Sequence, residues 1–135
     1  MIVYTSIDKY RLTLVAFLLT FIALLLPDPA ISANLLTLII GACAEEIIFR
    51  GVVQDFLSGT SFCKRSNNSS SVLPSRANVI TSVIFVFCHL FAHPPLWAVA
   101  TFFPSLLLGA VWDRHHNLYI CIALHLSYNF GYYYL

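Results

Sequence analysis

The residues best suited to carry out chemistry form a short charged run inside an apolar segment. Glu45, Glu46 and Arg50 lie near the middle of a segment that extends from about residue 32 to residue 57. Glu46 and Arg50 are four residues apart, so on a helix they share a face and can form an ion pair. Glu45 is rotated by about 100° from Glu46 and therefore faces a neighbouring direction. A buried carboxyl group beside a second acid is suited to act as a general base. A structural ion pair that joins two helices is the alternative.

Two further apolar segments carry imidazole and amide groups. His89 follows Phe85 by four residues, and His93 follows His89 by another four. In the last segment, His125 and Asn129 are again four residues apart and share a helix face. A histidine can transfer protons, and His125 and Asn129 can both donate hydrogen bonds to a developing oxyanion. For each residue taken alone, a structural interhelical hydrogen bond is the alternative.

The composition indicates which environment these polar groups occupy. Hydrophobic residues make up 59% of the 135 residues, and charged residues make up 10%. The mean hydropathy is +0.82, whereas a soluble domain has about a quarter of its residues charged. The net charge is +1 and no basic run is present, so the sequence does not indicate nucleic-acid binding. We therefore expect an integral membrane protein whose surroundings are the lipid bilayer.

The apolar stretches predict an all-α fold, a polytopic membrane helix bundle of about five transmembrane helices. A single membrane-embedded domain is expected over residues 1–135, with a motif core at about 34–135 and a polar loop at 58–76. Pro104 is predicted to kink the fourth helix. The helices are expected at about 11–26, 32–57, 77–92, 96–112 and 118–135.

The basic residues predict the orientation of this bundle. All of them except Arg50 fall on one side of the membrane if the five helices alternate in direction. Cytoplasmic loops carry an excess of Lys and Arg, so we expect a cytoplasmic N-terminus. These residues are Lys9, Arg11, Lys64, Arg65, Arg76 and Arg114.

The joint pattern resembles the CPBP family, which comprises the CAAX proteases and bacteriocin-processing enzymes also called Abi proteins. The family's first motif, two glutamates, three residues and an arginine, corresponds to 45–50. The second, a phenylalanine, three residues and a histidine, corresponds to 85–89. The third, a histidine, three residues and an asparagine, corresponds to 125–129. The order of the motifs on successive apolar segments also matches.

The resemblance implies a glutamic-type intramembrane endopeptidase without a metal or cofactor. It implies that Glu45 and His89 activate water and that His125 and Asn129 hold the oxyanion. Glu46 is also expected to be one of the catalytic residues. Arg50 and Phe85 are expected to support the site.

The resemblance also implies a membrane-anchored protein or peptide as the substrate. The stretches 93–97 and 103–106 are similar to a small bacterial subgroup associated with C-terminal sorting signals of the JDVT-CTERM kind. The resemblance therefore implies a substrate tail with such a signal and a location in the bacterial inner membrane. The chain is short for the family, with one helix before the motif core, and the proline often found ahead of the two glutamates is absent. These departures leave open whether a homo-oligomer completes the bundle.

Two other hypotheses remain open from the sequence. The first is a zinc-dependent membrane protease, because His89 and His93 are four residues apart and His125 or a glutamate could complete three ligands. The HExxH signature is missing, since the acids lie in a different segment. The second is a non-catalytic membrane scaffold, immunity protein or small proton-coupled carrier, because acids and histidines within a membrane also form proton relays.

Overall fold

The computed structural model describes residues 34–63 and 73–134. Every regular element in these two ranges is a helix, which confirms the predicted all-α fold. The described part contains four helical stretches, whereas about five helices were predicted for the whole chain. The predicted helix at 11–26 lies outside the described residues, as do residues 64–72 of the predicted loop at 58–76.

The first helical stretch contains an unexpected change of helix type. α2 (Leu35–Glu46) leads directly into a π-helix, η1 (Ile47–Gln54), which is followed by α3 (Asp55–Gly59). The Asn34 side chain caps α2 by accepting a hydrogen bond from the backbone N–H of Leu36 at 2.9 Å. The prediction of one regular helix over 32–57 is therefore wrong in its middle. Polar side chains on η1 bond to neighbouring helices, and we attribute the wider helical turn to these contacts.

The next helices are interrupted at positions that differ slightly from those predicted. α4 spans Arg76–Leu90, and a short turn leads to α5 (Pro95–Ala100) and α6 (Phe102–His115). The helix is interrupted at Thr101, three residues before Pro104, which is the turn that a proline at position 104 disturbs. Pro104 occupies the first turn of α6, where a missing backbone N–H costs no intrahelical hydrogen bond.

The last helix, α7 (Leu118–Tyr134), begins directly after a tight turn. His116 ends α6 in the left-handed conformation, with φ of 45°. The Asn117 side chain then accepts a hydrogen bond from the backbone N–H of Tyr119 at 2.9 Å. Because the connection is so short, α6 and α7 are antiparallel neighbours.

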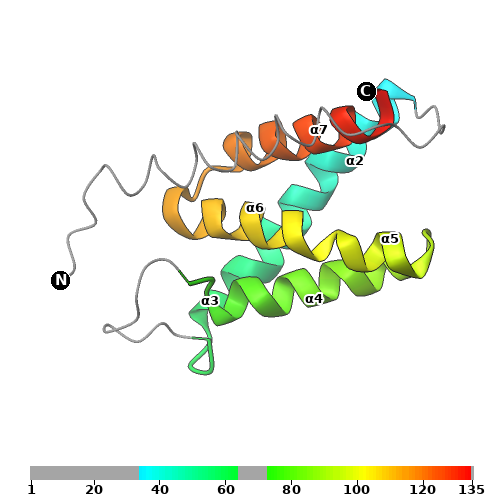
Figure 1. The fold of residues 1–135 in the computed structure, drawn as a ribbon. Coiled ribbons are helices and arrows are strands. Elements are labelled where there is room, and N and C mark those ends of the chain that lie inside the picture. Colours follow the sequence, from blue (N-terminus) through cyan, green and yellow to red (C-terminus); the bar gives the residue numbers. More distant parts are fainter. Residues whose placement is uncertain (1–33, 64–72, 135) are drawn as a thin grey trace.

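The helices form one layer with a long helix crossing it. α6 packs between α4 and α7, as Figure 1 shows. The stretch from α2 to α3 crosses this layer obliquely: α2 packs on α7, and η1 and α3 pack on α4. The C-terminal end of α7 and the start of α2 lie at the same end of the bundle (Figure 1). The middle of the crossing helix, which carries the acids, therefore faces α4, α6 and α7.

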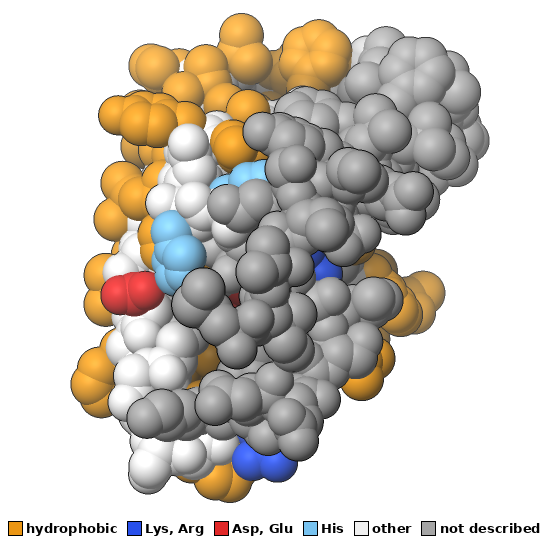
Figure 2. All heavy atoms as spheres, turned by 90° about the vertical axis from the view of Figure 1, so that its left-hand side faces the viewer, with side chains coloured by type: hydrophobic (Ala, Val, Ile, Leu, Met, Phe, Trp, Pro, Cys, Tyr) orange, Lys and Arg blue, Asp and Glu red, His pale blue; other side chains and the backbone are white. Residues whose placement is uncertain are grey.

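The interior is rich in polar groups and the exterior is rich in apolar ones. The hydrophobic core cluster lies between α6 and α7 and includes Leu108, Trp112 and Leu124. Large hydrophobic side chains are exposed on all four helical stretches. Figure 2 looks at the end of the bundle that carries α3 and the α6–α7 turn; charged and histidine side chains appear there among other polar groups, with hydrophobic side chains along the edges. The buried polar residues are Glu46, Arg50, Gln54, Asn78, Thr81, Ser82, Ser105 and His125.

Judged by length and composition alone, one described helical segment is long and apolar enough to cross a membrane. It is Pro95–His115, the combined α5–α6 stretch, with 21 residues and a mean hydropathy of 1.5. α4 is also apolar but has only 15 residues. At 1.5 Å per residue it is shorter than a hydrocarbon core of about 30 Å, so local thinning of the bilayer is expected around it.

Candidate functional site

Three helical stretches bring one carboxyl group and two imidazoles together. The Oε2 atom of Glu45 lies 3.9 Å from Nε2 of His89 and 3.7 Å from Nε2 of His125. These distances are slightly too long for hydrogen bonds but are typical of groups that share a small ligand. The Oε2 atom is buried and has no hydrogen bond within the described part of the chain. The three side chains come from α2, α4 and α7, as the three sequence motifs require.

The orientation of the His89 ring follows from a bond to its own helix. Its Nδ1 atom lies 2.9 Å from the carbonyl oxygen of Phe85. A carbonyl can only accept, so Nδ1 carries a hydrogen and Nε2 is the atom directed at Glu45. The Phe85 ring packs against the imidazole, with 4.2 Å between ring centroids. Phe85, predicted to support the site, thus contacts His89 through both its ring and its backbone.

The orientation of the His125 ring is set by the second glutamate. The His125 Nδ1 atom lies 2.8 Å from Oε1 of Glu46, while Oε2 of Glu46 accepts a hydrogen bond from Nε of Arg50 at 3.1 Å. Both Glu46 and Arg50 are completely buried. His125 therefore donates from Nδ1 to Glu46, and its Nε2 atom is directed at Glu45. Glu46 and Arg50 lie behind the imidazole, in positions suited to support it.

Arg50 is held by residues that the sequence motifs did not include. Its Nη2 donates to Oγ of Ser105 on α6 at 2.9 Å, and its Nη1 lies 3.5 Å from Oε1 of Gln54. Gln54 in turn donates to the carbonyl oxygen of Gly109 at 2.9 Å and to Asp113 at 2.8 Å. One sequence feature could have indicated Gln54: it continues the spacing of four that begins at Glu46 and Arg50.

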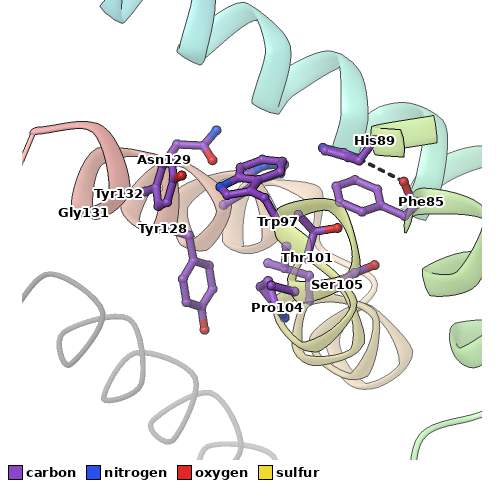
Figure 3. A pocket seen from close by; sticks show the side chains of 13 residues that line it. Phe85, His89, Trp97, Thr101, Pro104, Ser105, Tyr128, Asn129, Gly131 and Tyr132 are labelled. Atoms are coloured by element: carbon purple, nitrogen blue, oxygen red, sulfur yellow. Dashed lines mark hydrogen bonds between the residues drawn. The ribbon is translucent and has the colours of Figure 1, made fainter. Parts of the chain in front are cut away.

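A cavity of about 260 Å³ adjoins the two imidazoles. Figure 3 shows its walls, which come from α4, the α5–α6 stretch and α7. His89, His125 and Asn129 contribute polar groups to its lining, whereas Glu45 does not line it. Trp97 and Tyr132 pack edge to face across it, with ring centroids 5.5 Å apart. The cavity thus brings Asn129, the last predicted site residue, to the same space as the two histidines.

The rest of the cavity wall offers mainly apolar surface. The hydroxyl of Thr101 donates to the carbonyl oxygen of Ala98 at 2.6 Å. The hydroxyl of Ser105 accepts from Arg50 and donates to Ser82 at 3.0 Å. Both hydroxyl groups are therefore engaged within the protein. A cavity of about 150 Å³ lined by apolar groups can hold a benzene molecule, so this larger one can hold a bulky apolar side chain.

His93 takes part in ring stacking beside the site. It lies in the turn after α4, where its ring stacks on His89 with centroids 5.7 Å apart. The ring also packs at a tilt of 35° against Trp97, with centroids 4.1 Å apart. Burial lowers the pKa of His93, and the nearby His89 lowers it further. Within residues 34–63 and 73–134, no group of three His, Cys, Asp or Glu side chains has the arrangement of a metal site.

Comparison with known proteins connects this geometry with a family. A family model described as type II CAAX prenyl endopeptidase Rce1-like matches residues 27–131. The match covers most of the chain and includes all three motif segments, 45–50, 85–89 and 125–129. No curated protein and no solved structure matches the chain.

Proposed function

Because the chain belongs to the Rce1-like family of type II CAAX prenyl endopeptidases, we propose that it hydrolyses a peptide bond of a membrane-tethered protein by a glutamic-type mechanism. Members of this family are integral membrane endopeptidases that act on membrane-associated protein substrates. The observation that carries the mechanism is the shared contact at Glu45: one buried carboxylate oxygen faces Nε2 of both His89 and His125.

A water molecule is the nucleophile in this mechanism. A water within hydrogen-bonding reach of Glu45 and His89 can lose a proton to one of them as its oxygen attacks the substrate carbonyl carbon. General-base assistance of this kind is worth about 10²- to 10⁴-fold in rate. The distances of 3.7 and 3.9 Å are compatible with such a water, because catalytic hydrogen bonds often tighten only when substrate is bound.

His125 and Asn129 stabilise the tetrahedral intermediate by donating hydrogen bonds to its oxyanion. The Nδ1 hydrogen of His125 is committed to Glu46. Nε2 can therefore donate only when the ring is an imidazolium. As the C–N bond breaks, the leaving nitrogen receives the proton taken from water, and the products are a carboxylic acid and an amine.

The cavity supports a substrate with an apolar side chain close to the bond that is cut. Its volume is about 260 Å³, and His89, His125 and Asn129 contribute polar groups to a lining that is otherwise mainly apolar. The substrate on this proposal is a membrane-anchored tail, with a C-terminal sorting signal of the JDVT-CTERM kind as the finer hypothesis. The location is a bacterial inner membrane with the N-terminus in the cytoplasm.

The decisive experiment compares the wild type with Glu45→Gln in cells. Membrane proteins are profiled for new termini that depend on the active protein. We expect such termini in wild-type cells and none in Glu45→Gln cells at equal protein level. Asp55→Asn is the matched control, because Asp55 lies on the same helical stretch but its side chain is 58% exposed and outside the site. Equal cleavage by wild type and Glu45→Gln would contradict the mechanism, and no cleavage by either would favour a scaffold.

A zinc-dependent hydrolase is the alternative that a chelator separates from the glutamic mechanism. Imidazole and carboxylate are ligand types that zinc binds, although no three such side chains among the described residues have the arrangement of a metal site. Washed membranes assayed with and without o-phenanthroline separate the two. A glutamic protease keeps its rate in the chelator, whereas loss of activity that is restored by added Zn²⁺ would favour the zinc enzyme.

A further inference from the structure

We propose that Ser105 and Gln54 are positioning residues that fix which nitrogen of His125 faces Glu45. The catalytic consequence rests on the proposed function, whereas the orientation of the His125 ring does not. Both residues lie outside the three sequence motifs, and both bind the guanidinium of Arg50.

The hydrogen bonds form a directed chain that begins at His125 and Arg50. His125 donates from Nδ1 to one oxygen of Glu46, and Arg50 donates from Nε to the other. The remaining nitrogens of Arg50 donate to Ser105 and Gln54. Each guanidinium nitrogen therefore has its own acceptor, and each oxygen of Glu46 has its own donor.

This series of hydrogen bonds continues from Ser105 through two more side chains and ends at a backbone carbonyl oxygen. Ser105 donates to Ser82 at 3.0 Å, and Ser82 donates to Oδ1 of Asn78 at 3.2 Å. Asn78 then donates to the carbonyl oxygen of Leu106 at 2.9 Å. Ser105 and Asn78 are almost completely buried, so bulk water does not replace a lost partner easily. Each bond in the chain thus depends on the next.

The function of Ser105 follows from what Arg50 can do without it. An arginine and a carboxylate prefer a two-bond pair in which two N–H groups bind both carboxylate oxygens. Such a pair would place a second donor on Oε1 of Glu46, where it would compete with His125. Ser105 and Gln54 hold the two terminal nitrogens of Arg50, so only Nε faces Glu46. His125 therefore keeps its acceptor and presents Nε2 to Glu45.

The test uses NMR to measure directly which of the two ring nitrogens of His125 carries a hydrogen. The protein is labelled with ¹⁵N-histidine in lipid nanodiscs, and the His125 signals are assigned by their loss in His125→Gln. At alkaline pH, where neutral rings predominate, we expect the Nδ1–H tautomer in the wild type. Ser105→Ala should shift His125 toward the Nε2–H tautomer, and Ser105→Thr, which keeps a hydroxyl, should restore the wild-type signals. Ser105→Cys, a weaker hydrogen-bonding group of similar size, should lie between them.

The control is Ser127→Ala, which removes an α7 hydroxyl that donates to Ala123 and not to this chain. It should leave the His125 signals unchanged. Wild-type signals in Ser105→Ala or Ser105→Cys would overturn the proposal, whether or not the protein cleaves any substrate. Where cleavage is measured, loss of such a support is expected to lower turnover by about 10- to 100-fold with little change in KM.

Discussion

Glu45 and Glu46 are neighbours in the chain, yet their carboxyl groups meet different surroundings. Glu46 is completely buried and each of its oxygens has a partner. The Glu45 side chain is 35% exposed, and its buried Oε2 faces two imidazoles. The rotation of about 100° between successive helical residues produces this difference. One acid is therefore suited to chemistry and the other to holding His125 in place.

Asn129→Ala tests the proposed oxyanion contact. We expect turnover to fall by about 10²-fold, the usual loss when one oxyanion donor is removed. Substrate capture should change little, because the contact is made mainly in the transition state. Asn129→Asp should be worse, since a carboxylate would repel the oxyanion. Photocrosslinking of uncleaved substrate measures capture; lost crosslinking with unchanged turnover would make Asn129 a binding residue instead.

Arg50→Ala tests the buried ion pair. It leaves Glu46 without its guanidinium partner, and breaking such a pair from one side typically costs about 3–5 kcal/mol. Most single-domain stabilities are about 5–15 kcal/mol, so we expect a much lower steady-state level of folded protein. Quantitative immunoblotting of membranes measures this. Arg76→Ala is the control, because Arg76 makes an exposed contact with the carbonyl of Phe62; equal levels of the two variants would argue against a stabilising role for the pair.

The sequence predicted the charged and imidazole residues of the site but not their supports. Glu45, His89 and His125 stand out because ionisable groups are costly inside apolar helices. Ser105 and Asn78 do not stand out, since a lone serine or asparagine in a membrane helix is commonly a simple interhelical bond. Their role depends on which helix faces which, and that is a property of the packed bundle.

At the scale of helices, the close contact between α4 and α6 is made possible by a glycine. Gly109 lies against the side chains of Asn78 and Gln54. A methyl group there would overlap Oδ1 of Asn78 and come within 2.8 Å of Oε1 of Gln54. Asn78 has little freedom to move away, because it is bonded to Leu106 and Ser82.

Gly109→Ala should therefore destabilise the protein, although the same change usually stabilises a helix interior by about 0.5–1 kcal/mol. Thermal unfolding in detergent gives the sign of the effect. Gly59→Ala is the matched control, because nothing lies within 4 Å of a methyl group at that position. Adding Asn78→Ala to Gly109→Ala should restore part of the loss by removing the overlapping side chain. A more stable Gly109→Ala protein would show that α4 and α6 can move apart without cost.

Helix positions were predictable to within a few residues, but the local backbone form was not. The apolar runs and their breaks indicated all four described stretches. The π-helix over Ile47–Gln54 was not indicated, because none of its residues favours that form by itself. Contacts from Arg50 and Gln54 to α6 come from distant parts of the chain, and they outweigh the local preference for a regular α-helix.

At the scale of the whole molecule, the two ends of the bundle differ in their content of basic residues. Arg76 begins α4 and Arg114 lies in the last turn of α6. These positions belong to the end that carries α3 and the α6–α7 turn (Figure 1). The opposite end, which includes the turn between α4 and α5, has no Lys or Arg among its described residues. The positive-inside rule predicts that the basic end faces the cytoplasm.

Cysteine labelling tests this orientation. In a background without the four native cysteines, a cysteine at Phe91 should react with an impermeant maleimide added outside the cell. A cysteine at Tyr119 should react only after the membrane is permeabilised. Both positions are suited to labelling, with exposed fractions of 94% and 85%. The reverse pattern would place the N-terminus outside and reverse the proposed topology.

The bond between Arg50 and Ser105 has a consequence for the biogenesis of the protein. The two residues are 55 positions apart, so η1 emerges from the ribosome long before α6 is synthesised. A lone arginine at the centre of a bilayer costs about 2.5–3.5 kcal/mol during translocon-mediated insertion. Glu46, only four residues away, supplies a counterion from the same nascent helix. We therefore expect the pair that later orients His125 to act first as a charge-neutral unit that lets this helix enter the membrane.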